Sequence, residues 1–192
     1  MRDAIVRKAK ESAALKVAFF EENAAAIEAC ARALSVRLRE GARIWVMGNG
    51  GSSCDADHLA VEFTHPILEK RRSFPAASLL HGASVTAIAN DRDFGCVFED
   101  QLAVLARSGD VAIGISTSGA SANVVRGFKR ARTLGLMTIG FAGRDGGQLP
   151  DLCDHCFVVK TWSIHRIQEV HLTLLHVLWD HVHVALGEDD VL

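Results

Sequence analysis

The pattern that most constrains the fold is a buried strand followed by a turn and a helix, and it occurs twice. Residues 44–47 are a short apolar run with β-branched members, and glycines and an asparagine follow at 48–51. Residues 111–115 form a second apolar run, which a hydroxyl-rich turn follows at 116–123. Short, uniformly apolar strands are typical of parallel sheets buried on both faces. The repeat therefore predicts an α/β domain with ligands at the carboxyl ends of its strands.

The remaining elements complete a single domain over residues 1–192. Alternating apolar runs and helical periodicity predict an open five-stranded parallel sheet with helices on both faces. We expect further strands at 76–80, 137–141 and 157–159, and helices at 84–89, 97–106, 122–134 and 166–186. The polar run at 90–93 is expected to end the helix before it.

Residues from about 3 to 40 predict a long N-terminal helical arm that ends at Gly41. Apolar side chains recur along it at helical spacing, and Glu22-Asn23 marks a point where it kinks or divides. The apolar face has two interpretations, packing on its own sheet and packing on a partner subunit. We expect both, because terminal helices of this kind often build bundles at oligomer interfaces.

The composition excludes several classes of partner. The 192-residue chain has a formal net charge of −2, so it lacks the basic surface that nucleic acid or an anionic membrane requires. No apolar run reaches the length of a membrane span, and the charged N-terminus lacks the features of a signal peptide. We therefore expect a cytoplasmic protein that binds neither nucleic acid nor membrane.

Five cysteines without regular spacing also suit a reducing compartment. Cys153 and Cys156 flank Asp154-His155 and invite a metal interpretation, but a closed zinc site usually needs a second such pair. We expect ordinary loop or core cysteines at these positions. Elsewhere, the run at 69–72 is expected to form a basic patch.

The turn at 48–51 predicts an anion site at the start of a helix. Missing side chains let backbone N–H groups point at a ligand, and the helix dipole favours a phosphate or a polar sugar end. Ser52, Ser53 and Asp55 are candidates to cap this helix. The turn has neither the lysine of a P-loop nor the glycine spacing of a dinucleotide fingerprint. A merely structural tight turn is the alternative interpretation.

The turn at 116–123 has the same architecture with more hydroxyl groups. Ser116, Thr117, Ser118 and Ser121 lie beside the free N–H groups of a helix start. Together they predict a donor-rich cradle for a phosphate monoester that needs no lysine. The alternative is a capping motif with spare serines, but these hydroxyls exceed what a cap needs.

The chemistry is predicted where two helices present complementary side chains. His58 and Glu62 are four residues apart and share one helix face, while Gln168 and His176 on the last helix can reach one side together. Glu62 facing His176 across a polar ligand makes an acid/base pair. The same four residues offer nitrogen and oxygen ligands for zinc or a similar divalent ion. His171 is either a supporting residue or a core residue. The other histidines are expected on the surface or in the core, namely His65, His81, His165, His181 and His183.

These residues carry a resemblance to a known family. Gly48-Asn49-Gly50-Gly51-Ser52, with Asp55-Ala56, His58 and Glu62, resembles the opening motif of sedoheptulose 7-phosphate isomerases (phosphoheptose isomerases), which are SIS-domain proteins. The segments 86–91, 114–121, 146–147 and 166–171 continue the motif in order. The resemblance implies a flavodoxin-like SIS fold and a homotetramer with active sites at subunit interfaces. It also implies a metal-assisted aldose–ketose isomerase that makes D-glycero-D-manno-heptose 7-phosphate for lipopolysaccharide or other surface glycans.

The resemblance also implies roles for individual residues. Glu62 would be the general base, His176 its acid partner, and Gln168 a sugar or metal contact. The implied phosphate ligands are Ser116, Thr117, Ser118 and Ser121. The implied sugar contacts are Asn49, Gly50, Gly51, Ser52, Asn90 and Asp91. The implied zinc ligands are His58, Glu62, Gln168 and His176.

The sequence departs from the family pattern at three places near the expected sugar pocket. Pro66 replaces a frequent arginine, the loop at 80–82 is shorter, and the segment at 162–165 lacks a common Asp-Thr pair. A different sugar phosphate is therefore an alternative substrate. A non-catalytic SIS protein that binds a replication initiator is a second alternative, although such relatives lack the base and the last-helix histidine. A sugar-phosphate sensor is a third, and no DNA-binding segment is attached.

Overall fold

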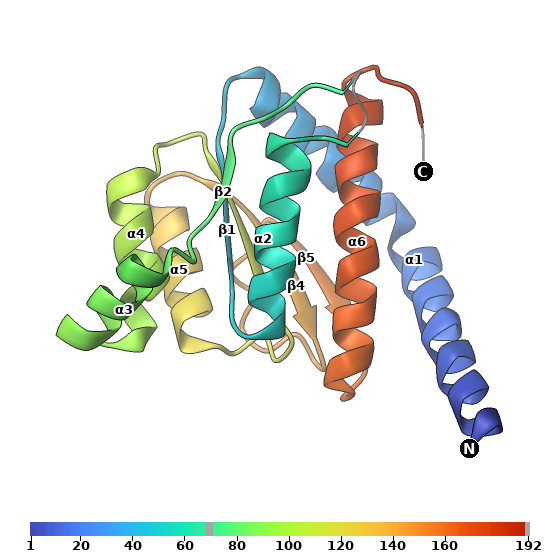
Figure 1. Cartoon of the computed structure of the whole chain (residues 1–192). Helices are drawn as coiled ribbons and strands as arrows, with labels where there is room; N and C mark the ends of the chain where they lie inside the picture. Colours follow the sequence, from blue (N-terminus) through green and yellow to red (C-terminus); the bar gives the residue numbers. More distant parts are fainter. Residues whose placement is uncertain (68–70, 191–192) are drawn as a thin grey trace.

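The computed structural model describes residues 1–67 and 71–190 and contains one parallel sheet of five strands (Figure 1). The strand order is β2-β1-β3-β4-β5, and every neighbouring pair is parallel. The strands are β1 (Ile44–Gly48), β2 (Ala76–Ser78), β3 (Val111–Ser116), β4 (Met137–Gly143) and β5 (His155–Val159). The predicted five-stranded parallel α/β fold is confirmed.

Helices cover both faces of this sheet, as Figure 1 shows. The helices are α1 (Arg2–Arg39), α2 (Gly51–Thr64), α3 (Gly82–Asp91), η1 (Phe94–Cys96), α4 (Val97–Leu105), α5 (Ala122–Thr133) and α6 (Ile164–Ala185). One core lies between the sheet and α1, α2 and α6, and a second lies between the sheet and α3, α4 and α5. Within residues 1–67 and 71–190, no helix combines the length and apolarity needed to cross a membrane.

The central strands are buried on both faces, which explains their uniform apolarity. Every residue of β3 and β4 is buried. Ile113 packs into the core on the α2 and α6 side, whereas its neighbour Ala112 packs into the other core. Because successive side chains of a strand alternate between faces, each strand supplies apolar groups to both layers.

The N-terminal arm is one helix of 38 residues rather than a divided one. Asn23, where a break was expected, donates its side-chain amide to the Phe19 carbonyl 2.8 Å away and so stays within the helix. The buried residues of α1 occur from Phe19 onward, and before that point the helix makes polar contacts with α6. The first half extends away from the sheet (Figure 1), which leaves room for the second predicted role, contact with a partner.

Several predicted boundaries are wrong, among them those of β2 and α3. β2 ends at Ser78 rather than at Leu80, although the Leu79 N–H still donates to the Val46 carbonyl. Helix α3 continues through Asn90 and Asp91, which were expected to break it. The carbonyls in the last turn of a helix make no hydrogen bonds within the helix. Residues with low helix propensity therefore lower the stability of an exposed helix only slightly at this position.

The predicted basic patch at 69–72 is only partly within the described residues, because Glu69 and Lys70 lie outside them. Arg71 is not a surface residue: it is buried and pairs with the buried carboxylate of Asp180 on α6. The Arg71 guanidinium also donates to the Asp189 carbonyl at 2.9 Å and lies 4.6 Å from the Trp179 ring centre. The methylene groups of an arginine side chain can pack in a core, and its charge is tolerated there when a carboxylate pairs with it.

We predict that Asp180→Asn lowers the free energy of unfolding by about 3 kcal/mol or more, since it leaves the buried Arg71 charge without its counter-charge. Urea unfolding followed by circular dichroism measures the change. Glu28→Gln is the matched control, because Glu28 pairs with Arg32 on the exposed face of α1 and such pairs contribute about 0.5 kcal/mol. Equal stability of the two variants would show that the buried pair does not hold α6 to the segment after α2.

Candidate functional site

The first Gly-rich turn is tight because the backbone folds back on itself. Gly50 has φ of 56° and is the N-cap of α2, and a Cβ at Gly48 would lie 2.4 Å from the Ser52 carbonyl oxygen. Only glycine tolerates both features well. Ser52, Ser53 and Asp55 lie inside α2, so the prediction that one of them caps it is wrong.

The second turn gathers the predicted hydroxyl groups at the end of β3. Ser116 Oγ lies 3.0 Å from Ser121 Oγ and 3.5 Å from Ser118 Oγ, and Thr117 lies between them in the chain. Ser121 is the N-cap of α5 but makes no side-chain capping bond, and its hydroxyl instead meets that of Ser116. This convergence of hydroxyls at a helix start suits an anion.

A third turn closes one side of this hydroxyl cluster. Gly119 has φ of 63°, and a Cβ there would lie 1.9 Å from the Gly146 carbonyl oxygen. The Gln148 N–H donates to the Gly119 carbonyl at 2.9 Å. The segment after β4 is therefore fastened to the turn after β3 by backbone contacts that no side chain would allow.

The two predicted turns are joined by an amide pair that the sequence did not reveal. Asn49 and Asn123 exchange two side-chain hydrogen bonds of 2.8 Å, and Asn123 is buried. The Asn123 side-chain oxygen also accepts from the Val124 N–H at 3.0 Å. The side chain of Asn49, a predicted sugar contact, thus ties the first turn to the start of α5. The place of Asn123 in the first turn of the predicted helix was the only available signal.

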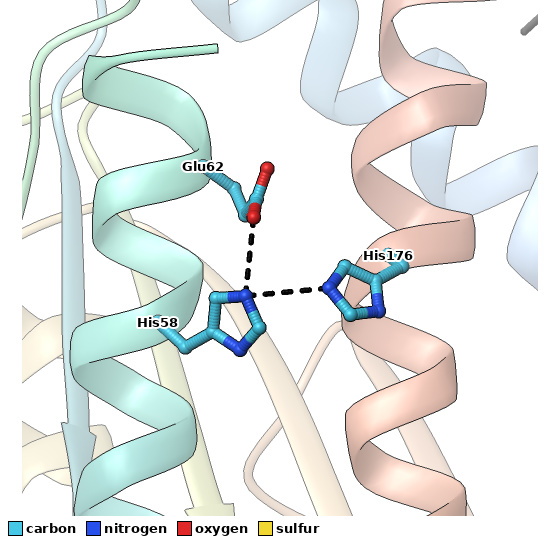
Figure 2. Close-up of side chains that lie close together, drawn as sticks. All are labelled: His58, Glu62 and His176. Atoms are coloured by element: carbon cyan, nitrogen blue, oxygen red, sulfur yellow. Dashed lines mark hydrogen bonds and ion pairs between the residues drawn. The ribbon is translucent and has the colours of Figure 1, made fainter. Parts of the chain in front are cut away.

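The predicted acid/base residues do meet, between α2 and α6 (Figure 2). His58 Nε2 lies 3.1 Å from Glu62 Oε1 and 3.3 Å from His176 Nε2. The two imidazoles are edge-on, with ring centres 4.8 Å apart. All three side chains are half-buried, which leaves one side open to a ligand. This cluster, His58–Glu62–His176, is the candidate centre of the site.

Burial tunes the titration of this cluster. Desolvation lowers the pKa of His176, and the positive charge of His58 lowers it further, while Glu62 opposes the shift. His176 is therefore mainly neutral at neutral pH. Burial also raises the pKa of Asp55, one turn before His58, and the neighbouring His58 counteracts this.

The cluster fits a divalent cation. Its three ligand atoms lie within 4.8 Å of one another, and it is the group of this kind found among the described residues. Ligands about 2.1 Å from a tetrahedral zinc are about 3.4 Å apart, close to the two shortest separations here. His58 Nε2 carries at most one proton and cannot satisfy both neighbours, whereas a cation would satisfy all three lone pairs.

Gln168, the fourth predicted metal ligand, does not lie beside the His58–Glu62–His176 cluster but further toward the start of both α2 and α6. Its side-chain amide fills the space over Gly51, where a Cβ would lie 2.3 Å from Nε2. Gln168, Gly51 and Asp55 also line a hollow of about 280 Å³ with His165, Glu169 and Leu172. Gln168 of α6 therefore lies beside the start of α2, two helical turns before His58.

Asn90 and Asp91, the other predicted sugar contacts, are not brought to the cluster in this chain. They are exposed at the end of α3, on the opposite side of the sheet from α2 and α6 (Figure 1). The Asn90 amide donates to Asp91 at 2.8 Å.

His171 is a packing residue in α6. It is fully buried, its Nε2 lies 3.0 Å from the Ala142 carbonyl oxygen on β4, and burial lowers its pKa to about 4. The neutral imidazole therefore donates to β4 and does not join the cluster.

The fold, the hydroxyl cradle and the cluster define a SIS domain, and the SIS domain family model matches residues 9–143. The phosphoheptose isomerase of Aquifex aeolicus is 43% identical over 180 residues, which cover 93% of this chain and 94% of that protein. The phosphoheptose isomerase of Desulfovibrio desulfuricans is 43% identical over 92% of this chain and 84% of that protein. The chain belongs to the phosphoheptose isomerase family of SIS-domain proteins.

Solved structures agree with this assignment. The phosphoheptose isomerase of Neisseria gonorrhoeae superimposes with a TM-score of 0.88 at 33% identity, over 94% of this chain and 97% of that one. The phosphoheptose isomerase of Francisella tularensis gives a TM-score of 0.90 at 29% identity, over 95% of this chain and 97% of that one. The predicted flavodoxin-like SIS fold is confirmed at the level of the whole chain.

Proposed function

We propose that this chain is an aldose–ketose isomerase that converts sedoheptulose 7-phosphate to D-glycero-D-manno-heptose 7-phosphate. Its relatives are named phosphoheptose isomerases over nearly the whole chain. The observation that carries the proposal is the meeting of Glu62 and His176 through His58, between α2 and α6. Groups that move protons and a site for phosphate are what this reaction needs.

Glu62 acts as the general base. It removes the proton from the carbon next to the carbonyl of the open-chain sugar, which gives a cis-enediolate, and returns it to the neighbouring carbon. One carboxylate oxygen, Oε1, faces His58, and the other points away from both imidazoles (Figure 2), which leaves it free to accept the proton. The contact with His58 fixes the orientation of the carboxylate.

His176 moves the hydroxyl proton between the two oxygens of the enediolate. A mainly neutral imidazole can accept a proton from one oxygen and give one to the other, so the lowered pKa of this residue suits the task. Its position on α6 places it on the opposite side of His58 from α2, the helix that carries Glu62 (Figure 2).

The hydroxyl cradle holds the phosphate at the other end of the sugar. Ser116, Thr117, Ser118 and Ser121 donate to its oxygens, together with free N–H groups at the start of α5. From the start of α2 to His58 is about 10 Å of helix, a length comparable with an extended seven-carbon sugar. Gly50, Gly51, Ser52 and Gln168 line the path between the two ends and contact the sugar hydroxyls.

We further propose one zinc ion per site, held by His58, Glu62 and His176. Gln168, two turns away beside Gly51, would contact the sugar instead. When bound, such an ion polarises the sugar carbonyl and stabilises negative charge on its oxygen. The donor set is chemically suitable, since imidazole and carboxylate are zinc ligands.

We also propose a homotetramer with active sites at subunit interfaces. An apolar groove of about 630 Å³ runs between α1 and α6, lined by Phe20, Ala24, Val177 and Val184 among others, and suits a helix of another chain. Asn90 and Asp91 would then contact the sugar bound by a neighbour. A cytoplasmic location accords with the free state of all five cysteines.

Glu62→Gln is predicted to lower kcat for sedoheptulose 7-phosphate by about a thousandfold, because the amide cannot accept the carbon-bound proton. His176→Asn is predicted to lower it by about a hundredfold or more. Both are measured by product formation, with circular dichroism to confirm the fold. The control is Glu99→Gln on α4, on the far side of the sheet. Turnover within a few fold of wild type in either variant would remove the role assigned to that residue.

Zinc content tests the ligand set without reference to turnover. After chelation and re-addition of Zn²⁺, elemental analysis is predicted to find about one ion per wild-type chain, and His58→Ala or His176→Ala to bind at least tenfold more weakly. His81→Ala, at the start of α3, serves as the control and should retain the ion. Equal affinity in all four proteins would contradict the site.

A further inference from the structure

Two cysteines outside the proposed active site lie close together at the start of β5, Cys153 just before the strand and Cys156 within it. Cys153 and Cys156 are separated by Asp154 and His155, and both are free. In the ladder of β4 and β5, Cys156 lies opposite Gly140. A Cβ at Gly140 would lie 2.8 Å from Cys153 Sγ and 3.3 Å from Cys156 Sγ. The missing side chain of Gly140 thus makes the space in which the two sulfurs converge.

The backbone on either side of the thiols is fixed. The Asp154 N–H donates to the Thr138 carbonyl at 3.0 Å, and the Thr138 N–H and hydroxyl donate to the Asp154 carboxylate at 2.8 and 3.0 Å. The Cys153 N–H donates to the Leu149 carbonyl at 3.0 Å. These bonds hold the two cysteines at the same place on the sheet edge, so the thiols need not search for each other.

We propose that Cys153 and Cys156 form a reversible disulfide by exchange with a low-molecular-weight disulfide such as oxidised glutathione. Both side chains are half-buried and therefore within reach of a small oxidant, whereas Cys30 and Cys96 are buried. A shared metal is not the better explanation, because the described residues that form a metal-type cluster are His58, Glu62 and His176.

Cys156 is the attacking thiol. The neighbouring Cys153 thiol lowers the pKa of Cys156, while the nearby Cys156 and burial raise the pKa of Cys153. The Cys156 thiolate attacks one sulfur of oxidised glutathione, which forms a mixed disulfide and releases one glutathione thiolate. The Cys153 thiolate then attacks Cys156 Sγ and releases the second glutathione. Two protein thiols are oxidised, one glutathione disulfide is reduced, and the two protons pass to the released thiolates.

The pair lies on the segment that also closes the hydroxyl cradle. This segment begins at Gly146, which contacts Gly119, and Gln148 donates to the Gly119 carbonyl. Buried Leu149 follows and accepts from the Cys153 N–H. A disulfide would therefore constrain the same stretch of chain that borders the predicted phosphate site.

The test is a thiol count with peptide mapping of the full-length protein. Cys54, the exposed cysteine, is first changed to Ser so that it does not form its own adduct. Incubation with oxidised glutathione, unfolding and titration with a thiol reagent are expected to show two of the four remaining thiols lost. The peptide that carries Cys153 and Cys156 is expected to be about 2 Da lighter, and dithiothreitol to restore it.

The matched control also removes Cys153, the thiol that attacks the mixed disulfide on Cys156. In Cys54→Ser with Cys153→Ser, the expected product is a stable glutathione adduct on Cys156. A stable adduct on Cys156 when Cys153 is present would overturn the proposal, because it would show that the second thiol cannot reach the first. Retention of all four thiols would overturn it equally.

Discussion

The packing of α6 beside α2 is the constraint on which the site depends. Neither helix carries the chemistry alone: α2 supplies His58 and Glu62, and α6 supplies His176. The two helices share one apolar core with the sheet, and Leu59 and Leu175 are fully buried in it. Because that core fixes the separation of the helices, the polar cluster between them is held without relying on its own hydrogen bonds.

A second constraint acts at the carboxyl ends of the strands, where backbone segments approach so closely that only glycine fits. Gly48, Gly119 and Gly146 lie where a Cβ would collide with neighbouring backbone or side chain. The turns they form bring a hydroxyl cradle and a helix start to one edge, and the Asn49–Asn123 amide pair joins them. The hydroxyl cluster and the His58–Glu62–His176 cluster are thus each built by elements that lie far apart in the chain.

The sequence predicted the elements whose signals are local. The apolar runs of β1 and β3, the hydroxyls at 116–121 and the i, i+4 spacing of His58 and Glu62 were all visible without a structure. The features that the sequence did not predict depend on residues far away in the chain. Arg71 is buried because it pairs with Asp180 on α6, and Asn123 is buried because it pairs with Asn49. Gln168 lies beside Gly51 because of the way α6 is placed along α2. That relative placement of two helices cannot be inferred from a local sequence pattern.

The most direct test of the central claim is solvent hydrogen exchange at the reacting carbons. Sedoheptulose 7-phosphate is incubated with the wild-type protein in D₂O through many cycles of interconversion, and the sugars are examined by NMR. Proton transfer through Glu62 predicts that deuterium enters at the carbon next to the carbonyl, and that Glu62→Gln abolishes its entry. Isomerisation without any deuterium uptake would contradict the account, since it would show that hydrogen passes directly between the two carbons.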